Sequence, residues 1–268
     1  MQKKWALILG ASSGFGGATA AALAKEGYNI FGVHLDRQAT MPKVNGIIKR
    51  IENTGQKAVF FNMNAADQLR RNDVLDEIKE RFTAKEHPQI HIVVHSLAFG
   101  TLKPYIGKSQ NDVIAPAQMS MTLDVMAHTL VYWTQGLIFR DLLAKNGRIF
   151  ALTSAGGQTV IPHYGAVSAA KASLESHIRQ LAVELGHMKI TANAIMAGVT
   201  DTPALAKIPN SDLMLRSAKS KNPQNRLTTP EDVAKAIVLL SKPEADWISG
   251  NTIGVDGAEY IVNYLGEK

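Results

Sequence analysis

The sequence predicts one doubly wound α/β domain, and three observations support this prediction. The chain has 268 residues, which suits one large hydrophobic core better than two separate ones. Short apolar runs alternate along it with longer stretches of helical periodicity. The short runs are continuous in Val, Ile, Leu and Phe, as expected of parallel strands that are buried on both faces. This alternation favours right-handed crossovers and a parallel sheet with helices on both sides.

The apolar runs predict seven strands, at residues 5–9, 29–33, 58–61, 90–95, 148–153, 190–195 and 252–255. Helical periodicity predicts covering helices at residues 18–26, 73–82, 119–144, 166–185 and 230–240. No repeat, low-complexity tract or linker divides the chain, so residues 1–268 are expected to form a single domain.

One interval departs from this alternation. Between residues 200 and 229 the strand pattern pauses, and the segment contains Pro203, Pro209 and Pro223 together with basic and apolar side chains. A long insertion of this kind is usually functional or mobile. We interpret it as a lid over a substrate pocket, and a plain surface loop is the alternative.

Composition excludes several kinds of site. Cysteine is absent, which removes disulfides, thiolate metal sites and cysteine nucleophiles. His91 and His95 share one strand face but lack a third ligand at metal-site spacing, so no metal site is expected. The net charge of +6 is spread along the chain, and no nucleic-acid partner is indicated. No run approaches the roughly 18 apolar residues of a membrane span, so we expect a soluble, cytoplasmic protein without a membrane partner.

A glycine-rich turn follows the first predicted strand and leads directly into a helix. Its sequence is Gly10-Ala11-Ser12-Ser13-Gly14-Phe15-Gly16. Glycines allow a diphosphate to approach the backbone closely, and the helix N-terminus favours the anion. This strand, turn and helix predict a Rossmann-type dinucleotide site. The spacing of the glycines resembles that of the short-chain dehydrogenase/reductase family. The resemblance implies that Gly10, Ser12, Ser13, Gly14, Phe15 and Gly16 hold the adenosine ribose and the diphosphate.

The second predicted strand is followed by Asp36 and Arg37, which favour different cofactors. A carboxylate about 20 residues beyond the glycines accepts hydrogen bonds from the ribose of NAD, whereas an arginine pairs with the 2′-phosphate of NADP. Because Asp36 repels a phosphate and Arg37 is able to stack on adenine instead, we predict NADH, with NADPH left open. Asn64 falls where the family often has an aspartate that contacts the adenine.

Tyr164 and Lys171 carry the predicted chemistry. They are seven residues apart, so on a helix they share one face and are offset by about 10 Å along its axis. The more common short-chain dehydrogenases place the tyrosine four residues before the lysine, and that position is Val167 here, which has no proton to give. The longer spacing resembles that of bacterial enoyl-acyl-carrier-protein reductases, as do the residues around it, Ile161-Pro162 and Lys171-Ala172-Ser173-Leu174-Glu175.

The chemistry of a 2-enoyl thioester explains this longer spacing. Hydride adds to the β-carbon, and the negative charge develops on the thioester oxygen farther along, so the proton donor must stand farther from the nicotinamide. Tyr164 is expected to stabilise the developing enolate. Lys171 is expected to bind the nicotinamide ribose and to lower the tyrosine pKa by its charge. The predicted activity is therefore reduction of the C2–C3 double bond of an acyl thioester, carried by acyl carrier protein or by coenzyme A.

Two features of the segment before Lys171 depart from the enoyl reductase pattern. Those enzymes usually carry a further tyrosine ten residues before the catalytic one, and Ser154 stands there. Ser154 is also where the catalytic serine of other family members falls, so a carbonyl-reducing or alcohol-oxidising enzyme that uses Ser154 and Tyr164 is the nearest alternative. A second alternative is a protein that binds a dinucleotide but performs no redox chemistry. His163 adjoins the tyrosine and is a further group able to titrate.

The resemblance extends to both ends of the pocket and to assembly. His95 and Ser96 end the fourth strand where other members have paired asparagines, and Val199 and Thr202 fall in the segment that meets the nicotinamide carboxamide. An apolar pocket beyond is expected to receive the acyl chain, lined by Phe99, Leu102, Leu205, Ile208 and Met214. Basic residues near the lid are candidates to meet an acidic carrier or phosphates, or form a solvated face: Lys207, Arg216, Lys219, Lys221 and Arg226. The family also implies a homotetramer, or a dimer, paired through helices 119–144 and 166–185.

Overall fold

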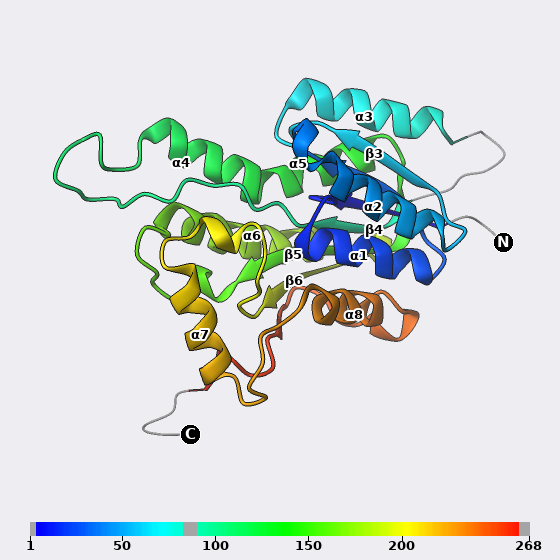
Figure 1. The fold of residues 1–268 in the computed structure, drawn as a ribbon. Helices are drawn as coiled ribbons and strands as arrows, with labels where there is room; N and C mark the ends of the chain where they lie inside the picture. Colours follow the sequence, from blue (N-terminus) through cyan, green and yellow to red (C-terminus); the bar gives the residue numbers. More distant parts are fainter. Residues whose placement is uncertain (1–3, 83–89, 263–268) are drawn as a thin grey trace.

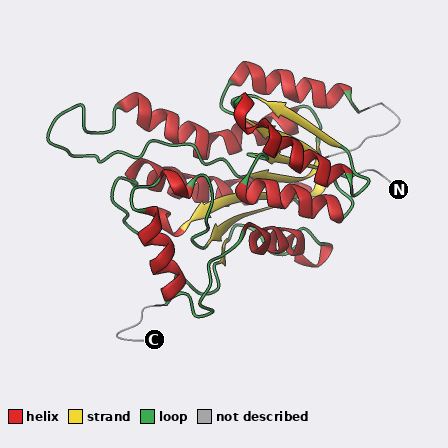
Figure 2. Ribbon diagram, in the orientation of Figure 1, coloured by secondary structure: helices red, strands yellow, loops and turns green. Residues whose placement is uncertain are grey.

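Seven parallel strands form one twisted sheet in the order β3-β2-β1-β4-β5-β6-β7. The computed structural model describes residues 4–82 and 90–262. Helices cover both sides of the strands (Figures 1 and 2). The predicted doubly wound fold is therefore confirmed.

The strands lie close to the ranges predicted for them. They are β1 (Trp5–Leu9), β2 (Asn29–His34), β3 (Ala58–Asn62), β4 (Ile90–His95), β5 (Leu143–Ser154), β6 (Thr191–Ala197) and β7 (Thr252–Val255). The helices are α1 (Gly14–Lys25), α2 (Met41–Glu52), α3 (Gln68–Glu80), α4 (Pro116–Leu123), α5 (Thr129–Phe139), α6 (Gly165–Glu184), α7 (Ser211–Lys221) and α8 (Pro230–Leu240).

The predicted helix 119–144 was wrong in two respects. A π-helical turn (Asp124–His128) separates α4 from α5, and α5 ends at Phe139 because the backbone of Asp141 turns left-handed, with φ of 54°. Leu143 and Ala144 already belong to β5, whose pairing with β4 shifts register between Ile90 and Ile92. Leu142, Leu143 and Ala144 are all buried, and periodicity does not distinguish a buried helix end from the start of a buried strand.

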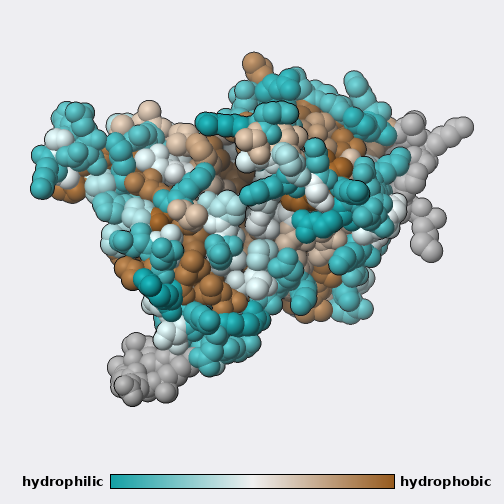
Figure 3. Space-filling model, viewed as in Figure 1, coloured by the Kyte–Doolittle hydropathy of each residue, from teal (hydrophilic) through white to brown (hydrophobic). Residues whose placement is uncertain are grey.

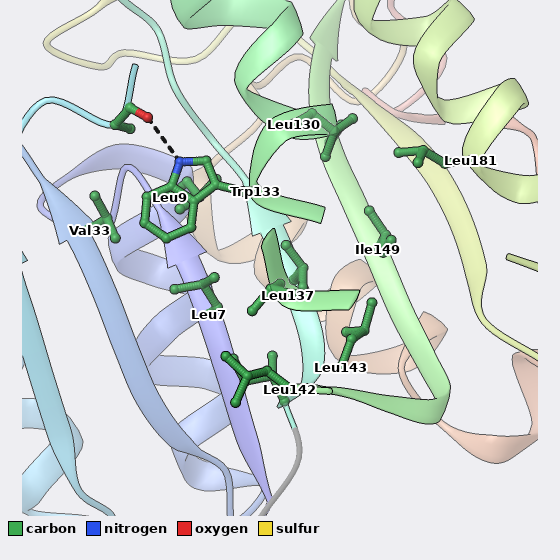
Figure 4. Close-up of a cluster of buried hydrophobic side chains, with 14 of the residues drawn as sticks. Leu7, Leu9, Val33, Leu130, Trp133, Leu137, Leu142, Leu143, Ile149 and Leu181 are labelled. Carbon is green, nitrogen blue, oxygen red and sulfur yellow. Dashed lines mark hydrogen bonds between the residues drawn. The ribbon is translucent and has the colours of Figure 1, made fainter. Parts of the chain in front are cut away.

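The sheet separates two apolar layers, one on each face. On one face α3, α5 and α6 contribute Leu75, Trp133 and Leu174 to a core over β1, β4 and β5, and the Trp133 indole donates to the carbonyl of Ala65 at 3.0 Å (Figure 4). On the other face α1, α2 and α8 bury Leu23, Ile51 and Ile237 against the same strands. Burial on both faces explains why the strands are continuously apolar.

The topology places the site at one edge of the sheet. From β1 the chain proceeds to β2 and β3 on one side, and then returns to β4 on the other. The loops after β1 and β4 therefore diverge and leave a crevice at the carboxyl ends of the strands, where open α/β sheets bind ligands. Gly10, Ser96 and Ser154 all lie at this edge. Among residues 4–82 and 90–262, no helix has the length and apolar character needed to cross a membrane.

Candidate active site

The glycine turn is packed so tightly that two of its glycines have no room for a side chain. Gly10 has φ of +91°, and a Cβ there would lie 2.4 Å from the carbonyl oxygen of Ser96. A Cβ on Gly16 would lie 2.1 Å from the carbonyl oxygen of Gly10. Ser13 caps α1 without a side-chain hydrogen bond, and the first turn of that helix holds no acidic residue. The close backbone approach and the free helix end are the features that a diphosphate site requires.

Asp36 lies beside this turn, at the end of β2. Its partial burial works to raise the pKa of the carboxyl, but hydrogen bonds with the side chains of Ser12, Thr40 and His34 outweigh that effect and hold the pKa below its ordinary value. The carboxylate is therefore ionised at neutral pH. Arg37, which follows it, is exposed.

Tyr164 precedes the first residue of α6 and is its N-cap. The carbonyl of Tyr164 accepts the first helical hydrogen bond from Ser168 at 2.8 Å. The residue is 8% exposed, and burial raises the pKa of its phenol, while a hydrogen bond with Ser154 acts in the opposite direction. The structure therefore brings together the two groups that the sequence places ten residues apart. The pKa of the phenol is raised overall, so the expected lowering by Lys171 was wrong. His163, before the tyrosine, is exposed and has a left-handed backbone, with φ of 65°.

Lys171 lies further along α6, with only 6% of its surface exposed. Its ammonium donates to the carbonyl of Leu152 at 2.6 Å. Burial lowers the pKa of Lys171 to about 8, and the carboxylate of Glu175 opposes this shift. Glu175 itself accepts a hydrogen bond from Thr153 at 2.7 Å.

A cavity of about 380 Å³ joins most of the predicted reacting groups. Its lining includes seven of the candidate site residues: Phe15, Ser96, Ser154, Tyr164, Lys171, Val199 and Thr202. The five residues expected to line an apolar pocket also line this cavity, namely Phe99, Leu102, Leu205, Ile208 and Met214. One concave site thus has a polar end at the sheet and an apolar end toward α7, where apolar side chains gather in Figure 3.

The other candidate residues lie outside the cavity lining. Of the glycine turn, only Phe15 lines the cavity, and the candidate residues outside its lining are Gly10, Ser12, Ser13, Gly14 and Gly16. Ser12 hydrogen-bonds the side chain of Asp36. The imidazole of His95 is fully buried, bonded to Thr129 at 2.8 Å, and burial lowers its pKa to about 3. Its side chain therefore faces the interior, and only its backbone lies at the sheet edge. The amide of Asn64 accepts a hydrogen bond from the backbone of Ala66 at 3.1 Å.

Sequence reasoning missed part of the cavity wall. Asp256, Glu259 and Tyr260 line the site from the segment after β7. Both carboxylate oxygens of Glu259 lie 3.3 Å from the backbone nitrogen of Val199, and the Tyr260 hydroxyl donates to Gln158 at 3.0 Å. Burial raises the pKa of Glu259. No spacing signal links residue 259 to residue 199, because only packing brings them together.

The interval 200–229 contains more regular structure than the sequence predicts. It holds a 3₁₀ turn (Leu205–Lys207) and the helix α7. Its basic residues do not form one cluster. Lys207 and Lys221 line the cavity, and the Lys207 ammonium lies 5.8 Å from the centre of the Phe99 ring. Arg226 instead pairs with Asp232 at 2.6 Å, at the start of α8.

Taken together, the glycine turn, the sheet-edge cavity and its paired tyrosine and lysine define an oxidoreductase of the short-chain dehydrogenase/reductase class. A family model described as enoyl-(acyl carrier protein) reductase matches residues 10–258. The chain belongs to that family.

Curated relatives include several kinds of reductase. The enoyl-[acyl-carrier-protein] reductase [NADH] FabI of Aquifex aeolicus is 29% identical over 191 residues, which cover 70% of this chain and 69% of that protein. A probable tetrahydroxynaphthalene reductase of Zymoseptoria tritici is 26% identical, covering 95% of this chain and 94% of that protein. The 3-oxoacyl-[acyl-carrier-protein] reductase FabG of Thermotoga maritima is 24% identical, covering 97% and 99%.

Solved structures confirm the fold. The structure of FabI from Candidatus Liberibacter asiaticus superposes with a TM-score of 0.84 at 24% identity, covering 98% of this chain and 97% of that one. The NADH-dependent enoyl-[acyl-carrier-protein] reductase of Aquifex aeolicus superposes with a TM-score of 0.82 at 25% identity, covering 98% and 99%.

Proposed function

We propose that this protein reduces the C2–C3 double bond of a 2-enoyl thioester with NADH, as an enoyl-acyl-carrier-protein reductase of fatty acid biosynthesis. The observation that carries the proposal is that Tyr164 and Lys171, seven residues apart, line one cavity whose far end is apolar. The family match and the enoyl reductase relatives support it.

The reaction assigns a separate task to each part of the site. A bound NADH would supply a hydride to C3 of the acyl chain, and negative charge would then develop on the thioester oxygen. Tyr164 stabilises that oxygen by hydrogen bonding, and C2 takes a proton from solvent to give the saturated thioester. Lys171 holds the ribose hydroxyls and contributes positive charge. The turn at Gly10–Gly16 binds the diphosphate, and Val199 and Thr202 hold the carboxamide.

The remaining parts of the proposal concern the substrate and the assembly. The apolar residues of the cavity receive the acyl chain, and residues 200–229 act as its lid. Lys207 and Lys221 at the cavity are placed to meet an acyl carrier protein or the phosphates of coenzyme A. We further propose a cytoplasmic homotetramer in which neighbouring copies pair through α6 and through the segment that includes α4 and α5.

A second function is favoured by one specific observation. The Ser154 hydroxyl interacts with the Tyr164 phenol, which is the arrangement expected of a carbonyl reductase that polarises a ketone. The FabG and naphthalene reductase relatives also cover more of this chain than the Aquifex FabI match does. Reduction of a 3-oxoacyl thioester or a related ketone is therefore the alternative.

One assay separates these functions. Crotonyl and acetoacetyl thioesters are each supplied with NADH and with NADPH, and oxidation of the nicotinamide is followed by absorbance. We expect turnover with the crotonyl thioester and NADH, and Tyr164→Phe should lower kcat by about 100-fold. Turnover of the ketone alone would favour the alternative. Dinucleotide binding without turnover of either substrate would favour a non-catalytic role.

A further inference from the structure

The side chain of Asp36 contacts a buried histidine. His34, the last residue of β2, has a side chain that is 2% exposed, and its Nδ1 lies 3.0 Å from Oδ2 of Asp36. Because the carboxylate is ionised and has only acceptors, the imidazole must donate Nδ1–H to it. The Asp36 side chain is 14% exposed, so it reaches the surface at the sheet edge. One of its oxygens thereby accepts from His34, and Ser12 and Thr40 also hydrogen-bond the carboxylate.

The backbone of Asp36 is also held by hydrogen bonds. The amide of Asn62, at the end of β3, accepts from the Asp36 N–H at 3.0 Å and donates to the Asp36 carbonyl at 2.9 Å. Asn62 pairs in register with His34, and Met63 donates to the His34 carbonyl at 2.7 Å. The side chain of Asp36 is therefore held by the last residue of β2, and its backbone by the neighbouring strand β3.

The same strand end is joined to the glycine turn. The carbonyl of Val33 accepts from the backbone nitrogens of Gly10 and Ala11 at 2.8 and 3.0 Å. Ser12 in that turn hydrogen-bonds the Asp36 side chain. Any group bound along the turn therefore meets a carboxylate whose direction is already set.

We propose that His34 is a positioning residue that determines which dinucleotide this protein accepts, by holding Asp36 as an acceptor for the two hydroxyls of an unphosphorylated adenosine ribose. The proposal rests on the proposed function only in requiring that a nicotinamide dinucleotide binds. A fixed carboxylate accepts from a diol and repels a 2′-phosphate. Without the imidazole donor, the Asp36 carboxylate loses its buried partner and keeps only its hydrogen bonds with Ser12 and Thr40. The carboxylate is then less firmly oriented, and exposed Arg37 beside it is able to meet the phosphate.

The test measures binding alone, by titrating the purified protein with NADH and with NADPH and following nicotinamide fluorescence, without any acyl substrate. His34→Phe and His34→Ala remove the donor, one with a larger side chain and one with a smaller. His34→Asn is the matched control, because its amide nitrogen lies at the same number of bonds from the backbone as imidazole Nδ1. Thermal unfolding verifies that each variant is folded.

We expect the wild-type protein and His34→Asn to prefer NADH. His34→Phe and His34→Ala should reduce the ratio of NADH to NADPH affinity by about 10-fold to 150-fold, the effect of losing one hydrogen bond to a charged group. Equal losses for both dinucleotides, an unchanged ratio in every folded variant, or a wild-type preference for NADPH would each overturn the proposal. Dinucleotide binding without enoyl reduction would refute the proposed function and leave this measurement intact.

Discussion

Lys171 keeps an ammonium group in a position where burial disfavours charge. Only 6% of the residue is exposed, and its neighbours are the carbonyl of Leu152 and the carboxylate of Glu175. Tyr164 is also buried, but its pKa moves in the opposite direction, upward. The two groups proposed to act together therefore titrate far apart, and the pH dependence of the activity is able to distinguish them.

We predict that kcat/KM falls as pH rises through about 8. The pKa of Lys171 is lowered to about 8, so the ammonium is present below that pH and is lost above it, whereas the raised pKa of Tyr164 leaves the phenol protonated over the same range. A pH-rate profile for the free enzyme checks this. A profile that stays flat to pH 10 would show that the charge of Lys171 is not needed.

At the scale of elements, the turn between β1 and α1 depends on two glycines that touch other backbone. Gly16 lies against the carbonyl of Gly10, and Gly10 lies against that of Ser96, so the turn, the start of α1 and the end of β4 form one packed unit. Gly46, in the middle of α2, is exposed, and a Cβ added there would meet no atom within 4 Å outside its own helix backbone. The two sites allow a matched comparison of the same substitution.

We expect Gly16→Ala to destabilise the protein by about 1–3 kcal/mol, because the added methyl group meets backbone that cannot yield. It should also weaken dinucleotide binding. Gly46→Ala should instead stabilise by about 0.5–1 kcal/mol, since alanine favours an exposed helix interior. Urea unfolding measures both. Equal effects of the two substitutions would mean that the turn is not close-packed as described.

At the scale of the whole molecule, several large apolar side chains on the proposed pairing helices face outward. Phe139 on α5 is 83% exposed, Val183 on α6 is 79% exposed, and Tyr132 on α5 is 38% exposed. Large exposed apolar side chains are candidates for contacts between copies of a protein. The proposed homotetramer would cover these three side chains.

The proposed homotetramer predicts a native mass of four times the 29.0 kDa of one chain. Phe139→Glu should lower that mass by placing a charge in the interface, and Leu69→Glu, at an equally exposed apolar position on α3, should leave it unchanged. Leu69 is 76% exposed. Light scattering after size-exclusion chromatography measures both variants. A monomeric wild-type protein, or equal effects of the two substitutions, would contradict the proposed pairing.

The sequence predicted the strands well because each is a local run of apolar residues. It failed where the deciding contact was distant or the local signal ambiguous. The predicted end of α5 lies too far along the chain because Leu142 and Leu143 are apolar and buried, like Leu137 on the inner face of that helix. The helices α2 and α7 are not among the predicted helices. For the site, spacing predicted that Tyr164 and Lys171 share a location, and both line the cavity.

What the sequence by itself determined is local: the order of strands and helices, the glycine turn, and the seven-residue interval between Tyr164 and Lys171. Tertiary structure alone decided that Glu259 reaches Val199, that Asn62 holds Asp36, and that the His95 side chain faces the interior. The physical reason is the distance along the chain over which each kind of interaction acts. Periodicity and turn chemistry act over a few residues, whereas these contacts join segments that meet only after the sheet has been assembled.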